Sequence, residues 1–221
     1  MVNSQRGRLI TLEGGDGVGK TTHIELLEAY LTEQGQSVLT TREPGGTALG
    51  EALRKVLLRD GLECGAETEM MVLFAARTQH LHAVLLPAIA KGQWVLCDRF
   101  TDATFAYQGG GRGIPFERIE RLETFVQDDF QPDLTLLLDL PVEEGLARVT
   151  GRGGRVDRFE KQDLAFKERV RRSYLQRQRD YPGRIQCVDA SGSVDEIQMT
   201  LRQHLQTLLR LDTNRDDISV A

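Results

Sequence analysis

The sequence predicts an α/β fold in which one five-stranded parallel sheet carries helices on both faces. Short apolar runs alternate along the chain with longer segments of helical periodicity, which is the pattern of parallel strands joined by helical crossovers. The most apolar run, Leu134–Leu138, shows no alternation, as expected of a strand buried on both faces. The length of 221 residues suits one core, so we expect a single domain over residues 1–211 and a polar, frayed tail over residues 212–221.

The first half of the chain supplies three of the expected strands. Leu9–Glu13 is an apolar strand that runs into a glycine-rich loop. A helix over residues 20 to about 33 follows, because Ile24, Leu27 and Leu31 fall on one face. The other segments expected here are a strand over Val38–Thr41, a helix capped by Thr47 and running to about Arg59, a long apolar helix from Thr68 that contains Pro87 or ends at it, and a strand over Trp94–Cys97.

The second half supplies the central strand and the last edge strand. Pro115 is expected in the first turn of a helix, where its missing N–H costs nothing. Leu134–Leu138 is the expected central strand, closed by Asp139. The other expected segments are a helix over Asp102–Tyr107 that breaks at Gly109–Gly111, a helix over Val142–Val149, a glycine-rich turn at Gly151–Gly154, a charged helix from about Lys161 to Arg179, a strand over Ile185–Val188 and a helix over Val194–Leu209.

Composition excludes several classes of protein. The formal net charge is −5, which argues against general binding to nucleic acid or to anionic membranes. No apolar window is long enough to span a bilayer, and the polar start lacks the apolar run of a signal peptide. The three cysteines have no metal-ligand spacing and indicate reduced thiols, so we expect a cytoplasmic protein.

The strongest chemical signal is a phosphate-binding loop between the first strand and the first helix. Residues 14–21 read Gly-Gly-Asp-Gly-Val-Gly-Lys-Thr and match the pattern G-x-x-x-x-G-K-[ST] in full. Glycines let backbone N–H groups wrap a phosphate, while the helix N-terminus favours the anion. Lys20 is expected to reach the outer phosphates of a nucleoside triphosphate, and the Thr21 hydroxyl to ligate Mg²⁺. The loop predicts a three-layer sandwich of the P-loop NTPase type.

Two carboxylates end strands at the same sheet edge, where ligands bind in open α/β sheets. Asp98 follows one strand and Asp139 the other, so either could hold Mg²⁺ or its waters. We favour Asp98, because Arg99 follows it and an Asp-Arg pair can serve metal and phosphate together. A helix N-cap is the alternative role for each acid.

Arginines in a second glycine-rich stretch predict a lid, and an acid inside the phosphate loop predicts a second substrate. Arg148, Arg152, Arg155 and Arg158 surround the glycines of a stretch over about residues 150–160. Such a mobile segment could close over the nucleotide and neutralise charge on the transferred group, although surface solubility is the plainer explanation. Asp16 lies inside the phosphate cradle, where it would repel phosphate. We expect it to point away and accept a hydrogen bond from a sugar hydroxyl.

Several segments in a fixed order resemble the bacterial thymidylate kinase family. The resemblance runs from about Leu9 to Leu209 and is carried by the loop over residues 13–22, Arg-Glu-Pro-Gly-Gly-Thr at 42–47, Leu-Phe-Ala-Ala-Arg at 73–77, Asp-Arg-Phe at 98–100, Ala-Tyr-Gln-Gly at 106–109, Pro-Asp-Leu-Thr at 132–135 and Arg-Val-Asp-Arg at 155–158. It implies transfer of the γ-phosphoryl group of ATP to thymidine monophosphate (dTMP), with Mg²⁺, on the route to dTTP. It also implies a homodimer, which the long apolar helix at residues 70–90 could serve, although that helix could equally belong to the core.

The resemblance assigns roles residue by residue. ATP binding falls to Gly14, Gly15, Asp16, Gly17, Val18, Gly19, Lys20, Thr21 and Thr22, with Arg148 near the adenine. Arg99 would bind the acceptor phosphate beside Lys20, and Asp16 the sugar 3′-hydroxyl. The implied base contacts are stacking by Phe74, a hydrogen bond from Arg77 to the carbonyl edge, and contacts from Thr104 and Gln108. Tyr107 would exclude a ribose hydroxyl, and Glu43 and Arg54 would complete the acceptor pocket.

Two positions set this chain apart within the family. Some members carry the catalytic arginine in the phosphate loop, where this chain has Gly17. Arg152, Arg155 and Arg158 instead fit the enteric type, in which the arginine comes from the lid. In many members the stacking phenylalanine lies four residues before the helix arginine, a position occupied here by Leu73. One residue on a helix is a rotation of about 100°, so the alternative role for Phe74 is that of an ordinary core aromatic.

Two alternative functions stay open at this stage. A P-loop kinase for another nucleoside monophosphate shares the phosphate loop, and Arg77, Tyr107 and Gln108 speak against it. A non-catalytic nucleotide switch is the alternative from another class. A guanine switch would carry Asn-Lys-x-Asp, and this chain contains no Asn-Lys pair.

Overall fold

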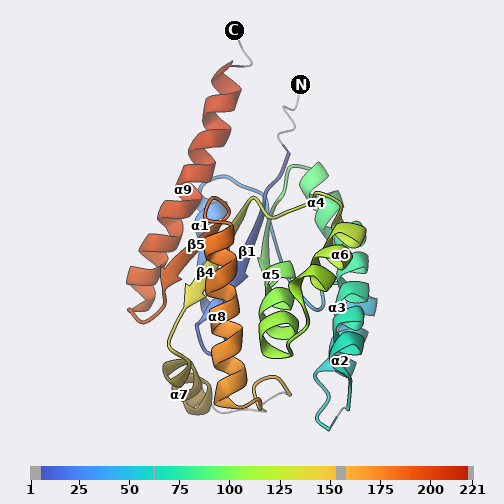
Figure 1. The fold of residues 1–221 in the computed structure, drawn as a ribbon. Helices are drawn as coiled ribbons and strands as arrows, with labels where there is room; N and C mark the ends of the chain where they lie inside the picture. Colours follow the sequence, from blue (N-terminus) through green and yellow to red (C-terminus); the bar gives the residue numbers. More distant parts are fainter. Residues whose placement is uncertain (1–5, 62, 153–157, 219–221) are drawn as a thin grey trace.

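A computed structural model of the protein describes residues 6–61, 63–152 and 158–218. The five strands form one parallel sheet in the order β2-β3-β1-β4-β5 (Figure 1). In chain order the elements are β1 (Leu9–Glu13), α1 (Lys20–Glu33), β2 (Val38–Arg42), α2 (Ala48–Leu57), α3 (Ala66–His80), the π-helical η1 (Leu81–Leu85), α4 (Leu86–Ala90), β3 (Trp94–Asp98), α5 (Thr101–Thr104), the π-helical η2 (Phe105–Gly111), α6 (Phe116–Gln127), β4 (Leu134–Asp139), α7 (Val142–Arg152), α8 (Leu164–Asp180), β5 (Ile185–Asp189) and α9 (Val194–Ile218). The predicted α/β architecture is therefore confirmed.

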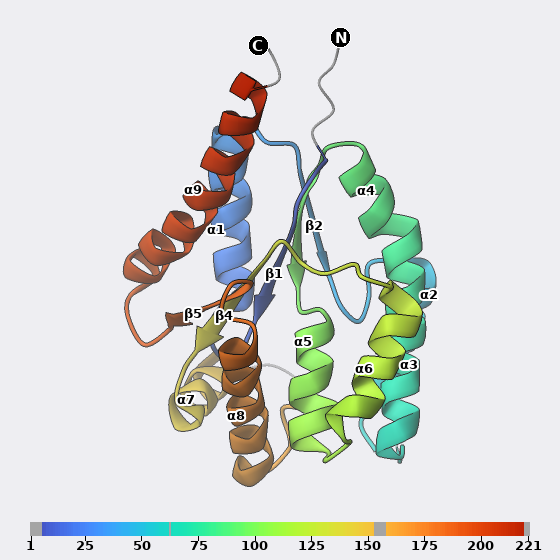
Figure 2. The same ribbon diagram turned by 45° about the horizontal axis from the view of Figure 1, so that its top comes forward.

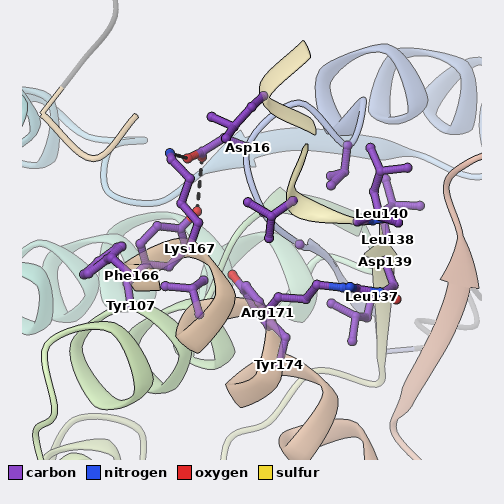
Figure 3. A pocket seen from close by; sticks show the side chains of 17 residues that line it. Asp16, Tyr107, Leu137, Leu138, Asp139, Leu140, Phe166, Lys167, Arg171 and Tyr174 are labelled. Carbon is purple, nitrogen blue, oxygen red and sulfur yellow. Dashed lines mark hydrogen bonds and ion pairs between the residues drawn. The ribbon is translucent and has the colours of Figure 1, made fainter. Parts of the chain in front are cut away.

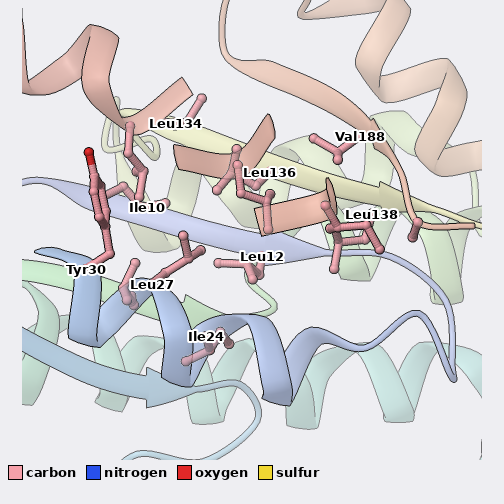
Figure 4. Packing of buried hydrophobic residues seen from close by; sticks show 14 of the residues in the cluster. Ile10, Leu12, Ile24, Leu27, Tyr30, Leu134, Leu136, Leu138 and Val188 are labelled. Carbon is pink, nitrogen blue, oxygen red and sulfur yellow. The ribbon is translucent and has the colours of Figure 1, made fainter. Parts of the chain in front are cut away.

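Strand alternation divides the core between the two faces of the sheet. Ile10 and Leu12 of β1 pack with α1 and α9, in the cluster drawn in Figure 4. Leu9 points the other way and packs with η1 and α4. Because successive strand side chains alternate, one five-residue strand serves both layers. Figure 2 shows α1 and α9 on one side of the sheet and α8, α5 and α3 on the other.

The glycines at 109–111 do not break the helix as the sequence predicted. The chain continues from α5 into η2, which ends at Gly111. A Cβ atom on Gly109 would lie 2.5 Å from the Phe116 ring, and one on Gly111 would lie 2.6 Å from the Phe166 ring. These glycines therefore let α6 and α8 approach η2 closely, which is a packing requirement that sequence periodicity does not reveal.

The last helix is longer than the sequence predicted. It continues to Ile218, whereas fraying was expected from residue 212. No glycine or proline lies between Val194 and Ile218, so the sequence holds no strong stop signal there. Within the described part of the chain, no helix combines the length and the apolarity needed to cross a membrane.

Candidate active site

The phosphate loop forms a cradle between β1 and α1. Helix α1 begins at Lys20, and its N-cap, Gly19, has a left-handed backbone (φ 92°) with no side-chain cap. The first-turn N–H groups of α1 are therefore free to bind an anion. Lys20 Nζ donates to the carbonyl oxygens of Gly14 (3.2 Å) and Gly15 (2.9 Å), so its ammonium group lies over the loop. Thr21 and Thr22 are exposed at its rim.

Gly17 lets the loop pack against helix α7. Its φ is 76°, and a Cβ atom there would lie 2.2 Å from the carbonyl oxygen of Gly145. A Cβ on Gly145 would in turn lie 2.6 Å from the Asp16 carbonyl oxygen. Contact this close leaves no room for a side chain at position 17 without moving α7. A loop arginine is thus incompatible with this arrangement.

Arg99 lies at the centre of a polar cluster beside the cradle. Its left-handed backbone (φ 68°) follows directly on β3 and turns the side chain towards the loop. Nη1 donates to the Gly14 carbonyl (2.9 Å) and to the Tyr174 hydroxyl (3.0 Å). Nη2 donates to the Tyr107 hydroxyl (3.0 Å) and to Asp16 Oδ1 (3.3 Å). The guanidinium group is thereby fixed between the loop and helices η2 and α8.

Asp16 is surrounded by positive charge. Lys167 of α8 donates to its Oδ2 (3.2 Å), and Figure 3 shows these two side chains together beside Tyr107. Burial opposes ionisation of Asp16, but Arg99, Lys20 and Lys167 outweigh it and lower the pKa of this carboxyl group. Burial, together with the charge of Arg99, lowers the pKa of Lys20 to about 8. Phosphate oxygens would relieve this crowding of cations.

Glu13 supports the same cluster from within the core. It is fully buried at the end of β1, accepts the Phe100 N–H at Oε1 (2.6 Å) and accepts the Tyr174 hydroxyl at Oε2 (2.7 Å). Burial, with the nearby charge of Asp102, raises the pKa of Glu13 to about 8. One carboxyl group therefore holds both the peptide after Arg99 and a hydroxyl that contacts its guanidinium group.

This shifted pKa predicts a pH-dependent stability. Because the pKa of about 8 in the folded protein exceeds the ordinary value of 4.5, stabilisation by the Glu13 proton is complete below pH 4.5. This stabilisation declines as the pH rises and is lost above pH 8. Between these limits the free energy of unfolding falls by up to about 1.4 kcal/mol per pH unit. Glu13→Gln carries no such proton, so its stability relative to wild type is expected to rise between pH 5 and pH 8. Urea unfolding without nucleotide measures this. The exposed Glu25→Gln is the matched control, and parallel wild-type and Glu13→Gln profiles would contradict the prediction.

A cavity distinct from the phosphate cradle opens between the phosphate loop, α2, α3 and η2. Of the residues expected to bind the acceptor, all but Phe74 line this cavity: Asp16, Glu43, Arg54, Arg77, Arg99, Thr104, Tyr107 and Gln108. The structure therefore brings together residues that lie as much as 92 positions apart, from Asp16 to Gln108.

Phe74 lies elsewhere, in the hydrophobic core. It is 2% exposed and packs with Phe105 and Ile119, and its ring faces the Arg77 guanidinium carbon at 4.8 Å. Leu73, one residue earlier on α3, lines the cavity instead. The rotation of about 100° per residue explains the difference. In this geometry an aliphatic side chain occupies the wall that the resemblance assigned to a stacking ring.

Arg77 is held rigidly but keeps one donor free. Its Nε donates to Glu43 Oε2 (2.7 Å), and its Nη2 donates to Thr104 Oγ1 (3.0 Å) and to the Phe100 carbonyl (3.1 Å). Its Nη1 is buried and has no hydrogen-bond partner. A buried donor left unpaired costs about 1–3 kcal/mol, so a ligand acceptor is expected here. Glu43 Oε1 also contacts His80 Nδ1 (3.0 Å), so both oxygens of this carboxyl group are used by α3.

The structure does not gather the expected lid arginines at the phosphate loop. Arg158 donates to the Leu57 carbonyl (3.0 Å) and to Glu69, on the acceptor side of the site. Arg152 ends α7, Arg148 is exposed on the same helix, and Arg155 lies outside the described residues. A catalytic role for this group stays a prediction, and in this conformation Arg158 is bound elsewhere.

The two strand-end carboxylates have different surroundings. Arg171 Nε and Nη2 each contact a separate oxygen of Asp139, both at 2.8 Å, so this acid is held in a bidentate ion pair. Asp98 Oδ1 is buried without a partner. Asp98 thus offers a free oxygen to a metal or its waters, whereas Asp139 does not. No group of three or more metal-binding side chains occurs among the residues that the structure describes.

Sequence reasoning missed residues that contribute to the site from a distance along the chain. Glu13 carried a usable signal, since an acid at the end of an apolar strand is unusual. Lys167 and Tyr174 lie seven residues apart, two turns on one face of α8, and both contact the Arg99–Asp16 cluster. Nothing in the sequence places that face against the loop.

Comparisons with known proteins agree with this geometry. The family model described as thymidylate kinase matches residues 12–201. The thymidylate kinase of Nitrosospira multiformis is 50% identical over 92% of this chain and 98% of its own length. That of Pseudomonas syringae pv. tomato is 54% identical over 93% of this chain and 98% of its own. The crystal structure of thymidylate kinase from Ehrlichia chaffeensis superposes with a TM-score of 0.75 at 32% identity, covering 91% of this chain and 99% of that one. Sequence, site and fold agree that this chain belongs to the thymidylate kinase family.

Proposed function

We propose that this protein is a dTMP kinase that transfers the γ-phosphoryl group of ATP to dTMP. The observation that carries the proposal is the acceptor cavity, which places Arg99 and Asp16 next to the phosphate loop and Arg77 and Gln108 farther along its wall. One end of the cavity therefore suits a phosphate and sugar, and the other a base with a hydrogen-bonding edge. Tyr107 also lines the cavity, with its hydroxyl group bonded to Arg99 and Asp16, and suits a deoxyribose.

The reaction follows from positioning and electrostatics. An oxygen of the acceptor phosphate attacks the γ-phosphorus in line, the new P–O bond forms, and the bond from that phosphorus to the bridging oxygen of ADP breaks. Lys20 and Arg99 hold the two anions together and offset their repulsion. Asp16, kept ionised by its cations, accepts a hydrogen bond from the sugar hydroxyl. No covalent intermediate on the protein is required.

A lid arginine is the proposed source of further charge stabilisation. The close packing of Gly17 on Gly145 supports this assignment, because a loop arginine has no room there. Arg152 and Arg155 are the remaining candidates in the lid, and Arg158 would first have to leave Glu69.

The residues present suit Mg²⁺ bound together with ATP. Thr21 is exposed at the loop, and Asp98 has a buried oxygen without a partner. Mg²⁺ typically keeps several waters and binds through one or two protein groups plus substrate phosphates, which fits two candidate ligands and no all-protein cage. When bound, the ion would neutralise charge on the transferred phosphoryl group.

We also propose a cytoplasmic homodimer. Met71 on α3 is 54% exposed and Phe125 on α6 is 84% exposed, and these two helices contact each other. Two contacting helices that each expose a large apolar side chain suit burial by a second copy. Light scattering should give twice the chain mass, and Phe125→Glu should shift it to the monomer.

Coupled ADP release across a panel of nucleoside monophosphates tests the proposed function. With ATP and Mg²⁺ present, dTMP is expected to stimulate ADP release strongly. Deoxyuridine monophosphate should react weakly, because a missing methyl group is worth about 1–3 kcal/mol in a fitted pocket. Stimulation by a different acceptor alone would keep the phosphate loop and overturn the base assignments. Nucleotide binding without stimulation by any acceptor would favour the switch.

A further inference from the structure

Glu69 is a buried acid close to the acceptor cavity that the proposed mechanism does not use. It lies on α3 with no exposed surface. Its Oε1 accepts the side-chain amide N–H of Gln108 at 2.8 Å. Arg112 Nη2 contacts its Oε2 at 3.3 Å, and Arg158 Nη2 contacts the same oxygen. Both oxygens of this carboxylate are therefore occupied by hydrogen bonds from the protein, two guanidinium groups and one amide group.

This arrangement fixes which end of the Gln108 amide faces the ligand. Arg112 and Arg158 also donate to the Glu69 carboxylate, so its oxygens act as acceptors and Gln108 turns its amide nitrogen towards Glu69. Gln108 itself lines the cavity. The end that it can offer a ligand is therefore the carbonyl oxygen, an acceptor. Without the carboxylate, the nearly symmetric amide could turn over and offer a donor instead.

Arg77 supplies the complementary donor on the same wall. Its Nη1 is buried without a partner, and the rest of its guanidinium group is held by Glu43, Thr104 and the Phe100 carbonyl. A fixed donor beside a fixed acceptor matches the edge of a pyrimidine with a carbonyl at position 4 and an N–H at position 3. Thymine and uracil have that edge. Cytosine has the opposite pattern, with an amino group at position 4 and a bare nitrogen at position 3.

We propose that Glu69 is a specificity-determining residue, which orients Gln108 so that the site selects pyrimidines with an N3–H over cytosine. Glu69 acts through Gln108 and is a positioning residue, because it need not touch the substrate. The inference rests on the proposed dTMP kinase function and adds the physical basis for refusing a cytosine acceptor.

The test measures base preference, defined as kcat/KM for dTMP divided by kcat/KM for deoxycytidine monophosphate (dCMP). Glu69→Gln keeps the size of the side chain but lets the Gln108 amide turn over. The preference is expected to fall about 10- to 100-fold, with dCMP activity rising in absolute terms. The exchange variant E69Q/Q108E restores an acceptor-only group at the cavity and is expected to recover the preference. Arg112→Gln, which removes a charge partner of Glu69 but leaves the amide contact, is the control and should keep the wild-type ratio.

A second measurement avoids changing the buried acid. Methylation of N3 removes the donor from dTMP, so wild type should lose at least about tenfold in kcat/KM with this analogue. Gln108→Met has no acceptor that needs the N3–H, so its kcat/KM should fall much less when the N3-methyl analogue replaces dTMP. Circular dichroism and thermal unfolding show which variants are folded.

The outcomes separate the inference from the proposed function. Wild type that does not phosphorylate dTMP overturns the function itself. Wild type that is active on dTMP but accepts the N3-methyl analogue equally well overturns the inference alone. A folded Glu69→Gln that keeps the wild-type base preference also overturns the inference. An exchange variant that folds but fails to recover the preference overturns it as well. A loss of dTMP activity with no gain on dCMP would mean that Glu69 is merely structural.

Discussion

Replacing Arg99 with alanine is expected to lower kcat/KM for dTMP about 10³-fold or more while the fold survives. Its guanidinium group is fixed at 2.9–3.3 Å from Gly14, Tyr174, Tyr107 and Asp16, at the junction of the loop and the acceptor cavity. It therefore needs little reorganisation to grip a phosphate, and arginines that stabilise phosphoryl transfer are worth about 10³–10⁵ in rate.

Arg99→Lys separates charge from shape. A lysine keeps the charge but not the planar fork that grips phosphate at two oxygens. We expect it to recover about one-tenth to one-hundredth of wild-type kcat/KM, mainly through kcat. Arg179→Ala is the control, since Arg179 lies in the last turn of α8 and contacts the neighbouring Gln176. Steady-state kinetics with varied dTMP measure both variants. Turnover of Arg99→Ala close to that of wild type would contradict the role assigned to Arg99 in phosphoryl transfer.

Replacing Lys20 with alanine is expected to cost about 10²- to 10³-fold in kcat/KM for ATP. The ammonium group lies over the loop and donates to two of its carbonyl oxygens, so a phosphate can take over these contacts without a large movement. A hydrogen bond to a charged group contributes about 1.5–3 kcal/mol, and the loss of one or two accounts for that factor. The effect on kcat should exceed the effect on KM, because charge develops on the transferred group in the transition state.

Lys91→Ala is the matched control for Lys20→Ala. Lys91 is exposed and precedes β3, at the end of the sheet opposite the phosphate loop. The same unit of positive charge is lost there, so unchanged kinetics would show that the effect of Lys20→Ala is local. Equal losses in both variants would instead indicate a long-range charge effect and would contradict the assigned role. Thermal unfolding of both variants checks that the fold is retained.

Most of the architecture could be predicted because it depends on patterns among residues that are close together in the sequence. The strand at Leu9–Glu13 and the helix at Lys20–Glu33 match their predicted bounds, since an apolar run, a glycine-rich loop and a one-sided apolar face are all short-range features. The predictions failed where distant segments decide the outcome. Gly109 and Gly111 continue a helix because aromatic rings from α6 and α8 pack against them. The position of Phe74 depended on a rotation of one residue, which only the packing of α3 fixes.

The sequence by itself determined the order of elements, the phosphate loop and the family to which this chain belongs, because each depends on residues close together in the chain or on a motif in a fixed order. Only the tertiary structure decided how the distant polar groups pair. Glu13 holds Arg99 through Tyr174, 161 residues further on, and Arg171 occupies Asp139 and leaves Asp98 with the free oxygen. Glu69 sets the orientation of Gln108. These pairs matter because they are buried: a polar or charged group away from water needs a hydrogen-bond partner within the protein. Which residue becomes that partner is decided only when the chain folds.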